Sequence, residues 1–273
     1  TLTAYRDVDG DGVADEAKDL VQGLGFGLDF RGADHTTNGM EMGIDGWLYI
    51  AFGDYGFVKA IGSDGTEIQH RGGGVVRVRP DGSELEVYAT GTRNNYDVAV
   101  DPYLNLFARG NTNDGGGWDV RLHHFVAGAH YGYPSLFKNF ADEVVPPLAD
   151  YGSGSGTGAL YVQDPGLPEP YGDALYTIDW GTSKIYRHPL QPNGSTFTVG
   201  QEVFLEVDRP TDMYLDGASR LYVSSWRGGR YRYGGENVGY IARLTYPEAT
   251  PSRAPDLEAA SDPRLVELIE IGR

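Results

Sequence analysis

A strand–turn–strand unit recurs along this chain, and its recurrence limits the folds that the chain can adopt. Each copy has a short strand of alternating apolar residues, a turn rich in Asp, Asn and Gly, and a second strand that ends in small or polar residues. Clear copies occupy residues 39–54, 96–111 and 210–226, and a degenerate copy occupies residues 164–180. Further stretches with strand character follow most copies, so the complete unit has about four strands. The repeat predicts an all-β protein.

Repeated four-stranded units are typical of a β-propeller, whereas a β-sandwich has short strands without this internal similarity. We expect a six-bladed β-propeller that is truncated at the N-terminus, because the first 24 residues supply two outer strands and the last unit shows three strands. A five-bladed ring is the alternative if the two ends pair directly, since propellers close to avoid open sheet edges.

The domain boundary is expected at a change of composition. Residues 1–247 form the predicted propeller domain, and residues 248–273 are a proline-punctuated linker followed by the start of a helical segment. Leu265, Val266, Leu268 and Ile269 have helical spacing, with Ser261 or Asp262 as N-cap and Pro263 in the first turn. We expect one short C-terminal helix there.

Charge excludes several partners. The 273 residues carry 39 acidic against 22 basic side chains, a formal charge of −17. Nucleic acids and anionic membranes both require a basic face, so we expect neither as a partner. The sequence has no cysteine, which excludes disulfides and zinc–thiolate sites. It also has no apolar run long enough for a membrane-spanning helix, so we expect no membrane insertion by this segment.

The first clear copy carries two groups capable of chemistry. His35 precedes the hairpin of residues 39–54, which turns at Asp45-Gly46, and Asp54 lies at the end of its second strand. A loop histidine is often merely solvated, but a histidine and a carboxylate that bracket one rigid hairpin indicate a site.

The segment 7–15, with sequence DVDGDGVAD, has the spacing of a calcium loop. Calcium prefers oxygen ligands, and alternate positions supply them here: Asp7, Asp9, Asp11, the Val13 carbonyl and Asp15. Gly12 permits the sharp turn, but Lys18 stands where the closing glutamate of such loops is expected. We interpret the segment as a structural calcium clamp; the alternative is an acidic turn that binds no metal.

Three segments together resemble a known group of proteins. They are DHTTNGMEMGIDGWLYIAFGDYG (34–56), YATGTRNNYDVAVDP (88–102) and NTNDGGGWDVRLHHFVAGAHYGYP (111–134). They are similar to segments of the quinoprotein sugar dehydrogenases, which include soluble glucose, aldose sugar and sorbosone dehydrogenase-like proteins. Within this group, the chain most resembles the propeller domain of the membrane-bound dehydrogenase-like proteins. The resemblance covers residues 1–247.

The resemblance implies oxidation of an aldose or alcohol hydroxyl with pyrroloquinoline quinone (PQQ), supported by a cofactor-bound calcium. It implies His35 as the general base, Asp54 as the carboxylate that orients it, and Arg93 as the cation beside the quinone. Asn94 and Arg209 would also bind the cofactor, and Gly110, Asn111 and Thr112 would supply the calcium-binding loop. The group further implies a cytochrome c electron acceptor and a periplasmic or extracellular location.

The chain also departs from this group. The lysine that binds a PQQ carboxylate has no clear equivalent, since Lys184 lies a few residues from the matching position, and Thr211 replaces a second arginine near Arg209. Two alternatives therefore remain. One is a calcium-stabilised binding module without catalysis, and the other is a lactonase-like hydrolytic propeller.

Overall fold

The computed structural model describes residues 1–25, 35–111, 120–136, 139–227, 236, 238–246 and 255–270. These residues form two compact units, which we describe separately. The first unit comprises Thr1–Val98 and Phe125–Pro147, and the second comprises Ala99–His124 and Leu148–Arg273.

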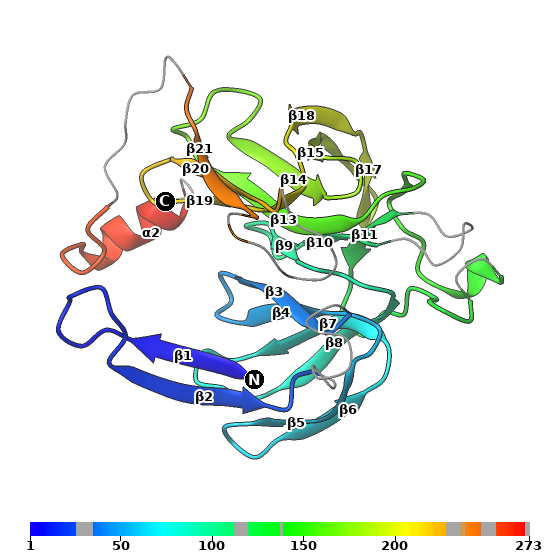
Figure 1. Cartoon of the computed structure of the whole chain (residues 1–273), viewed down its shortest axis with the longest axis horizontal. Helices are drawn as coiled ribbons and strands as arrows, with labels where there is room; N and C mark the ends of the chain where they lie inside the picture. Colours follow the sequence, from blue (N-terminus) through cyan, green and yellow to red (C-terminus); the bar gives the residue numbers. More distant parts are fainter. Residues whose placement is uncertain are drawn as a thin grey trace. The chain divides into compact units, whose positions relative to one another are not determined.

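The first unit contains two antiparallel four-stranded sheets (Figure 1). One sheet has the order β1-β2-β5-β6, with strands β1 (Leu2–Arg6), β2 (Glu16–Gln22), β5 (Phe57–Gly62) and β6 (Glu67–His70). The other has the order β3-β4-β7-β8, with strands β3 (Thr37–Met42), β4 (Leu48–Phe52), β7 (Gly73–Val78) and β8 (Glu86–Thr92). The predicted hairpin of residues 39–54 is thus confirmed as β3 and β4. Strands β5 and β6, which complete the sheet that β1 and β2 begin, were not predicted from the sequence.

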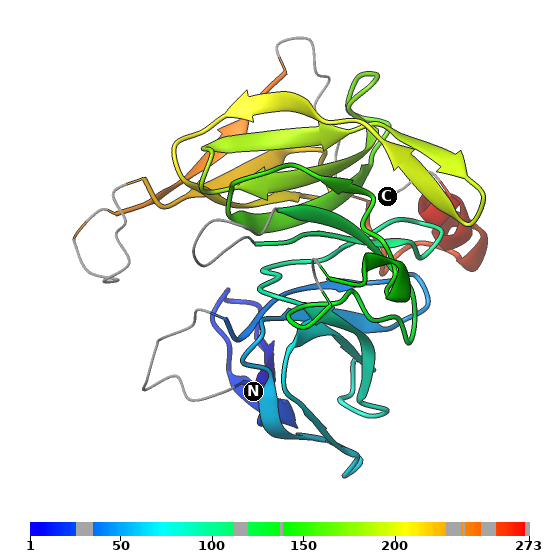
Figure 2. The same cartoon turned by 90° about the vertical axis from the view of Figure 1, so that its right-hand side faces the viewer.

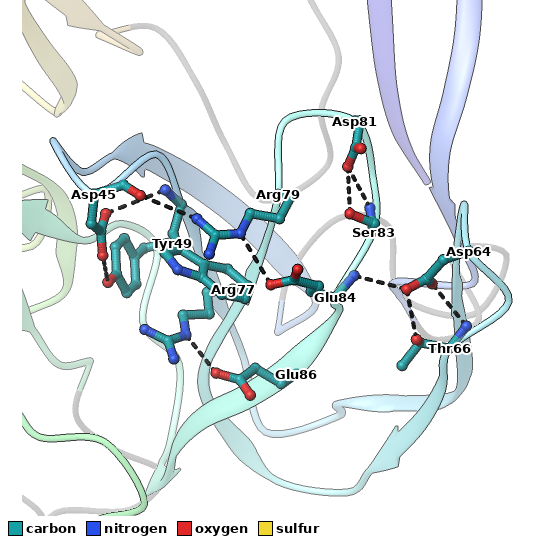
Figure 3. A network of polar contacts seen from close by, with 11 residues as sticks. Asp45, Tyr49, Asp64, Thr66, Arg77, Arg79, Asp81, Ser83, Glu84 and Glu86 are labelled. Atoms are coloured by element: carbon teal, nitrogen blue, oxygen red, sulfur yellow. Dashed lines mark hydrogen bonds and ion pairs between the residues drawn. The ribbon is translucent and has the colours of Figure 1, made fainter.

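The turn of the β3–β4 hairpin is fixed by a polar network at the end of the sheet opposite His35 (Figure 3). Gly46 has φ 73°, a conformation that glycine adopts without strain. The Tyr49 hydroxyl donates to Asp45 Oδ2 at 2.8 Å, and Arg79 Nη1 donates to the Asp45 carbonyl at 3.1 Å. Burial and the Asp45 carboxylate raise the pKa of Tyr49 to about 12, so the phenol stays a donor.

Two arginines lie over one indole in the same network. The Cζ atoms of Arg77 and Arg79 lie 4.2 and 3.9 Å from the ring centroid of Trp47, within the range of cation–π contacts. Arg77 pairs with Glu86 at 2.5 Å, and Arg79 pairs with Glu84 at 3.1 Å. These contacts hold β4, β7 and β8 together at this end of the sheet.

The second unit contains three sheets of three or four strands, besides one two-stranded hairpin (Figure 1). One has the order β12-β11-β10-β9, with strands β9 (Ala99–Val100), β10 (Leu106–Arg109), β11 (Arg121–Phe125) and β12 (Ala149–Asp150). The next has the order β13-β14-β15-β18, with strands β13 (Gly156–Gln163), β14 (Asp173–Asp179), β15 (Lys184–His188) and β18 (Glu202–Glu206). The last, of order β19-β20-β21, has β19 (Pro210–Leu215), β20 (Leu221–Ser225) and β21 (Tyr240–Leu244).

Smaller elements complete the description. The hairpin of β16 (Leu190–Asn193) and β17 (Thr196–Val199) is inserted between β15 and β18. A 3₁₀ turn, η1, spans Ala141–Glu143. The predicted C-terminal helix is confirmed as α2 (Asp262–Glu270), red in Figure 2. None of the helices in the described part of the chain is long and apolar enough to cross a membrane.

The predicted strand–turn–strand unit at residues 164–180 is confirmed only in its second half. Its second part forms β14, but residues 164–172 form no strand, and the partner of β14 is β13, which precedes the copy. The Asp164 side chain caps this connection, because its Oδ1 accepts from the Gly166 amide at 2.6 Å and from the Ser219 hydroxyl at 2.9 Å. The proline-rich segment that resembled a strand is therefore a loop.

Apolar side chains fill the space between successive sheets within each unit. In the first unit, one core joins Val21 and Phe57 of one sheet to Ile50, Phe52 and Val76 of the other. In the second unit, one core joins the sheet of β13–β15 to that of β19 and β20, and another joins the sheet of β9–β12 to β13 and β14. The burial of both faces of β4 explains why its sequence, LYIAF, is continuously apolar.

Candidate functional site

His35 and Asp54 form a pair at one end of the β3–β4 hairpin. His35 lies just before β3 and Asp54 just after β4, and Thr37 pairs with Phe52 across the hairpin. The two side chains are 11 % and 19 % exposed, and His35 Nδ1 hydrogen-bonds to Asp54 Oδ1. A carboxylate on Nδ1 selects the tautomer with the proton on Nδ1 and leaves Nε2 as the basic nitrogen. The pair has the arrangement of a general base with its orienting group.

Tyr55 contacts the same imidazole. The two rings stack with centroids 5.2 Å apart and an interplanar angle of 28°. The Tyr55 amide also donates to the His35 carbonyl at 3.2 Å. His35 itself has φ 61°, a left-handed conformation that is uncommon outside glycine. Strained backbone of this kind is frequent at functional sites.

Arg93 and Asn94 follow β8 of the same sheet. Because neighbouring strands of the sheet alternate in direction, the end of β8 lies at the same sheet end as His35. A β-bridge between Gly53 and Asn94 joins the two segments directly. Arg93 is half-buried, which places a cation at this end, but Asn94 is only 1 % exposed. Asn94 is therefore packed into the sheet end, and its predicted role as a cofactor donor stays a prediction.

Two further histidines lie in the same unit, and the sequence analysis did not single them out. The His70 ring packs against Phe52 and Phe57, with centroids 5.6 and 6.5 Å away. His130 Nδ1 lies 3.0 Å from the Thr90 hydroxyl of β8. Burial, and then the charge of His130, lower the pKa of His70. Their positions 35 and 95 residues from His35 gave no local signal in the sequence.

Arg209 belongs to the second unit. Its Cζ lies 4.1 Å from the ring centroid of Trp180, and its Nη1 donates to the Trp180 carbonyl at 3.1 Å. The Trp226 ring lies 6.2 Å from that of Trp180. Arg209 also has a left-handed backbone, with φ 47°. A guanidinium over a half-buried indole is suited to a planar anion, but its predicted meeting with His35 stays a prediction.

The predicted calcium-binding loop follows β10. The Gly110 amide donates to the Arg121 carbonyl at 2.7 Å, and the Asn111 side chain donates to the Ser155 hydroxyl at 2.7 Å. Thr112 lies outside the described residues. The ligand role of all three stays a prediction.

A buried ion pair that was not predicted from the sequence lies next to this loop. Arg109 Nε and Nη2 both donate to Asp179 Oδ2 at 3.0 Å, and the two side chains are 2 % and 0 % exposed. Arg109 Nη1 donates to Gln201 at 2.8 Å, and its Cζ lies 4.8 Å from the Tyr186 ring centroid. The other Asp179 oxygen accepts from the amides of Ser155 and Thr182 at 3.0 and 2.9 Å. The pair joins the ends of β10 and β14 within the second unit.

His123 and His124 are adjacent residues of β11, so their side chains face opposite sides of the sheet. His123 is 3 % exposed, and burial lowers its pKa to about 3. The His124 ring stacks on Phe107, and its Nδ1 lies 3.0 Å from the Thr196 hydroxyl. The two imidazoles thus have separate environments.

The acidic loop between β1 and β2 gathers three of its five predicted ligands. One carboxylate oxygen from each of Asp7, Asp9 and Asp15 lies within 4.8 Å of the others. The Asp11 carboxylate accepts from the Val13 amide at 2.8 Å and is not in this group. The amides of Gly12 and Gly10 donate to Asp7 and lower the pKa of its carboxyl group, which favours the charged form that a cation requires.

The chain was compared with known protein families, curated proteins and solved structures. Residues 1–215 match a family described as a domain of unknown function (DUF7133), and the chain belongs to this family. No curated protein matches the sequence.

Among solved structures, the chain is similar to an oxidoreductase (glucose dehydrogenase) from Thermus thermophilus, with a TM-score of 0.59 and 19 % identity. It is also similar to the PQQ-bound aldose sugar dehydrogenase from Streptomyces coelicolor, with a TM-score of 0.56 and 21 % identity. The matches cover 78 % and 76 % of this chain, and 66 % and 61 % of those chains. The chain therefore spans less than two thirds of their length. The predicted β-propeller fold of the quinoprotein glucose dehydrogenase type is confirmed.

Proposed function

We propose that this protein is a sugar or alcohol dehydrogenase domain that uses PQQ and passes electrons to a cytochrome c. The observation that carries the proposal is the His35–Asp54 pair at a sheet end that also carries Arg93, in a fold shared with sugar dehydrogenases. A periplasmic or extracellular location and a small sugar or alcohol substrate belong to the same proposal.

The residues present fit such a cofactor in two respects. PQQ is a planar tricarboxylate, so its site requires cations and flat surfaces. Arg93 follows β8 at the end of the sheet that holds His35, and Arg209 lies over the Trp180 indole in the second unit. Arg93 would hold the cofactor beside His35, Arg209 stays a predicted cofactor ligand of the second unit, and the bound quinone would supply the hydride acceptor.

The protein's own residues would handle the proton. Asp54 holds the Nδ1 proton of His35, so Nε2 is the nitrogen that takes the proton of the substrate hydroxyl. The imidazolium that forms is stabilised by the Asp54 carboxylate next to it. Because both side chains are mostly buried, water screens this attraction less than it would at the surface.

We further propose that the loop of residues 7–15 is a structural calcium site, with Asp7, Asp9 and Asp15 as its carboxylate ligands. The support is their mutual distance, together with the sequence spacing. Asp11, which is not in this group, and the Val13 carbonyl stay predicted ligands. Calcium is expected to raise the melting temperature of the wild-type protein, and Asp7→Asn is expected to remove that increase. An equal response in both proteins would contradict the site.

A calcium-stabilised binding module is the second candidate. Two observations favour it: Arg209 already donates to the Trp180 carbonyl, and Thr211, which stands in place of a second arginine, bonds to Ser224 at 2.7 Å. A site without that cation would bind PQQ less tightly.

One reconstitution separates the candidates. The protein is mixed with PQQ and calcium, separated from free PQQ, and scanned for the absorbance of bound quinone; dye reduction is then followed with a panel of aldoses and alcohols. Bound quinone with substrate-dependent dye reduction is the expected result. Absence of bound quinone at saturating PQQ would overturn the dehydrogenase proposal and favour the binding module.

A further inference from the structure

The segment after β4 forms a tight turn of four residues, Gly53-Asp54-Tyr55-Gly56. The Gly56 amide donates to the Gly53 carbonyl at 2.9 Å and closes the turn. Gly56 has φ 59°, which suits a glycine. The turn has a glycine at each end, and each glycine lies against the backbone of a histidine.

Gly53 lies against His35. A Cβ atom added at Gly53 would lie 2.5 Å from the His35 carbonyl carbon and 2.6 Å from its Cα. The same Cβ would lie 2.6 Å from Asn94 Oδ1. These distances are well below van der Waals contact, so any side chain at position 53 would displace the backbone of His35, the Asn94 side chain, or both. The Gly53 amide also donates to the Thr36 carbonyl at 2.7 Å.

Gly56 lies against the other histidine. A Cβ atom there would lie 2.2 Å from the His70 carbonyl oxygen. The turn is thus confined between two segments, one before β3 and one after β6. Because both contacts are to backbone atoms, a rotation of a side chain cannot relieve them.

The two inner residues of the turn hold the imidazole itself. Asp54 hydrogen-bonds to Nδ1 of the imidazole, and the Tyr55 ring stacks on the imidazole. Gly53 sets the backbone of His35, Asp54 sets the rotation of its ring, and Tyr55 limits its tilt. Each contact constrains a different degree of freedom of one side chain.

We infer that Gly53 and Tyr55 are positioning residues that, together with Asp54, fix the His35 imidazole for proton transfer. The proton-transfer role of His35 rests on the proposed function. The positioning of its imidazole by Gly53, Asp54 and Tyr55 does not depend on that function. Misplacement of a reacting group by about 1 Å can lower a rate by about 100-fold.

The test reads the imidazole directly and needs no cofactor. Proton–nitrogen NMR correlations of the six histidine rings are recorded, with the His35 signals assigned by their loss in His35→Gln. In the wild-type protein the His35 Nδ1 proton is expected downfield and slow to exchange, as in a buried imidazole–carboxylate pair. In Gly53→Ala that proton is expected to exchange faster with solvent, and the ring signals of His35 are expected to shift.

Gly200→Ala is the matched control, since a Cβ there would meet its nearest atom, Pro189 Cδ, at an ordinary 3.4 Å. It is expected to leave the His35 signals unchanged. If Gly53→Ala fails to fold, Tyr55→Leu replaces it, because Tyr55 is half-buried and leucine keeps much of its apolar contact while removing the stacked ring.

In the PQQ-loaded enzyme, Gly53→Ala and Tyr55→Leu are expected to lower kcat by about 10- to 100-fold with little change in KM. Unchanged His35 ring signals and an unchanged exchange rate of its Nδ1 proton in folded Gly53→Ala or Tyr55→Leu would overturn the inference. Altered His35 signals in a protein that oxidises no substrate would support the positioning and refute the dehydrogenase proposal, so the two failures are distinguishable.

Discussion

Replacement of Asp179 by asparagine should destabilise the second unit strongly. The introduced side chain would keep one oxygen for the amides of Ser155 and Thr182, but it would present an NH₂ group where Asp179 Oδ2 now accepts twice from Arg109. Arg109 is 2 % exposed, so its charge would lose its counter-ion without gaining water. Removing one partner of a buried ion pair costs about 3–5 kcal/mol.

The expected change can be measured by calorimetry or urea unfolding. The unfolding entropy of globular proteins is about 2.1 cal/mol/K per residue, or about 0.6 kcal/mol/K for a chain of 273 residues. A loss of 3–5 kcal/mol therefore corresponds to a decrease in Tm of about 5–9 °C. Glu206→Gln is the control, because it removes an exposed pair with Lys184 at 3.7 Å and should change stability by less than about 1 kcal/mol. A melting temperature for Asp179→Asn within about 1 °C of wild type would refute the reasoning.

Three other predictions concern stability. Burial lowers the pKa of His123 and His188 to about 3, so between about pH 6.5 and 3 the unfolded chain binds more protons than the folded protein, and the free energy of unfolding should decrease by about 1.4 kcal/mol for each histidine with every unit that the pH falls. The difference between the urea midpoints at pH 7 and pH 5 should be smaller in His188→Gln than in wild type, and equal differences would contradict this prediction. Arg79→Ala removes the stacking on Trp47 and the bond to the Asp45 carbonyl, so urea unfolding should show a decrease of about 1–2 kcal/mol in the free energy of unfolding. Lys59→Ala, which removes only an exposed ion pair with Glu67, should cost less than about 0.5 kcal/mol, and equal losses in the two variants would argue against the network. Gly74→Ala places a Cβ 2.0 Å from the Ala89 carbonyl oxygen and should cost about 1–3 kcal/mol by the same measurement; an unchanged midpoint would show that β7 and β8 adjust freely.

The parts of the fold that the sequence predicts are those with local patterns. The hairpins of residues 39–54, 96–111 and 210–226 follow from alternation around a turn, and all three are present. Strands β5 and β6 were missed because they are an insertion outside the repeat, and the pairing of β5 with β2 connects residues about 40 positions apart. In the degenerate copy, the prolines and glycines of residues 164–172 are consistent with either the end of a strand or a loop. The Asp164 side chain accepts from the Gly166 amide and thereby stabilises the loop.

In the candidate site, too, the contacts within one hairpin are predictable from the sequence and the contacts between distant segments are not. His35 and Asp54 are 19 residues apart across one hairpin, so sequence and strand geometry suffice to bring them together. Gly53 and Asn94 meet across a sheet, and Arg109 and Asp179 are 70 residues apart on different sheets. No pattern of composition or spacing predicts such contacts, since they depend on which strands pair and on how the sheets pack. Asn94 shows the limit most clearly: its motif suggests a ligand donor, while its burial makes it part of the packing around Gly53.

The central claim is that His35 is the base that accepts the substrate proton. Its most direct test is the rate of aldose-dependent dye reduction by the PQQ- and calcium-loaded protein, compared between wild type and His35→Ala. General bases contribute about 10²- to 10⁴-fold to such rates, so His35→Ala should lose at least about 100-fold while still binding PQQ. Undiminished oxidation by His35→Ala would contradict the account.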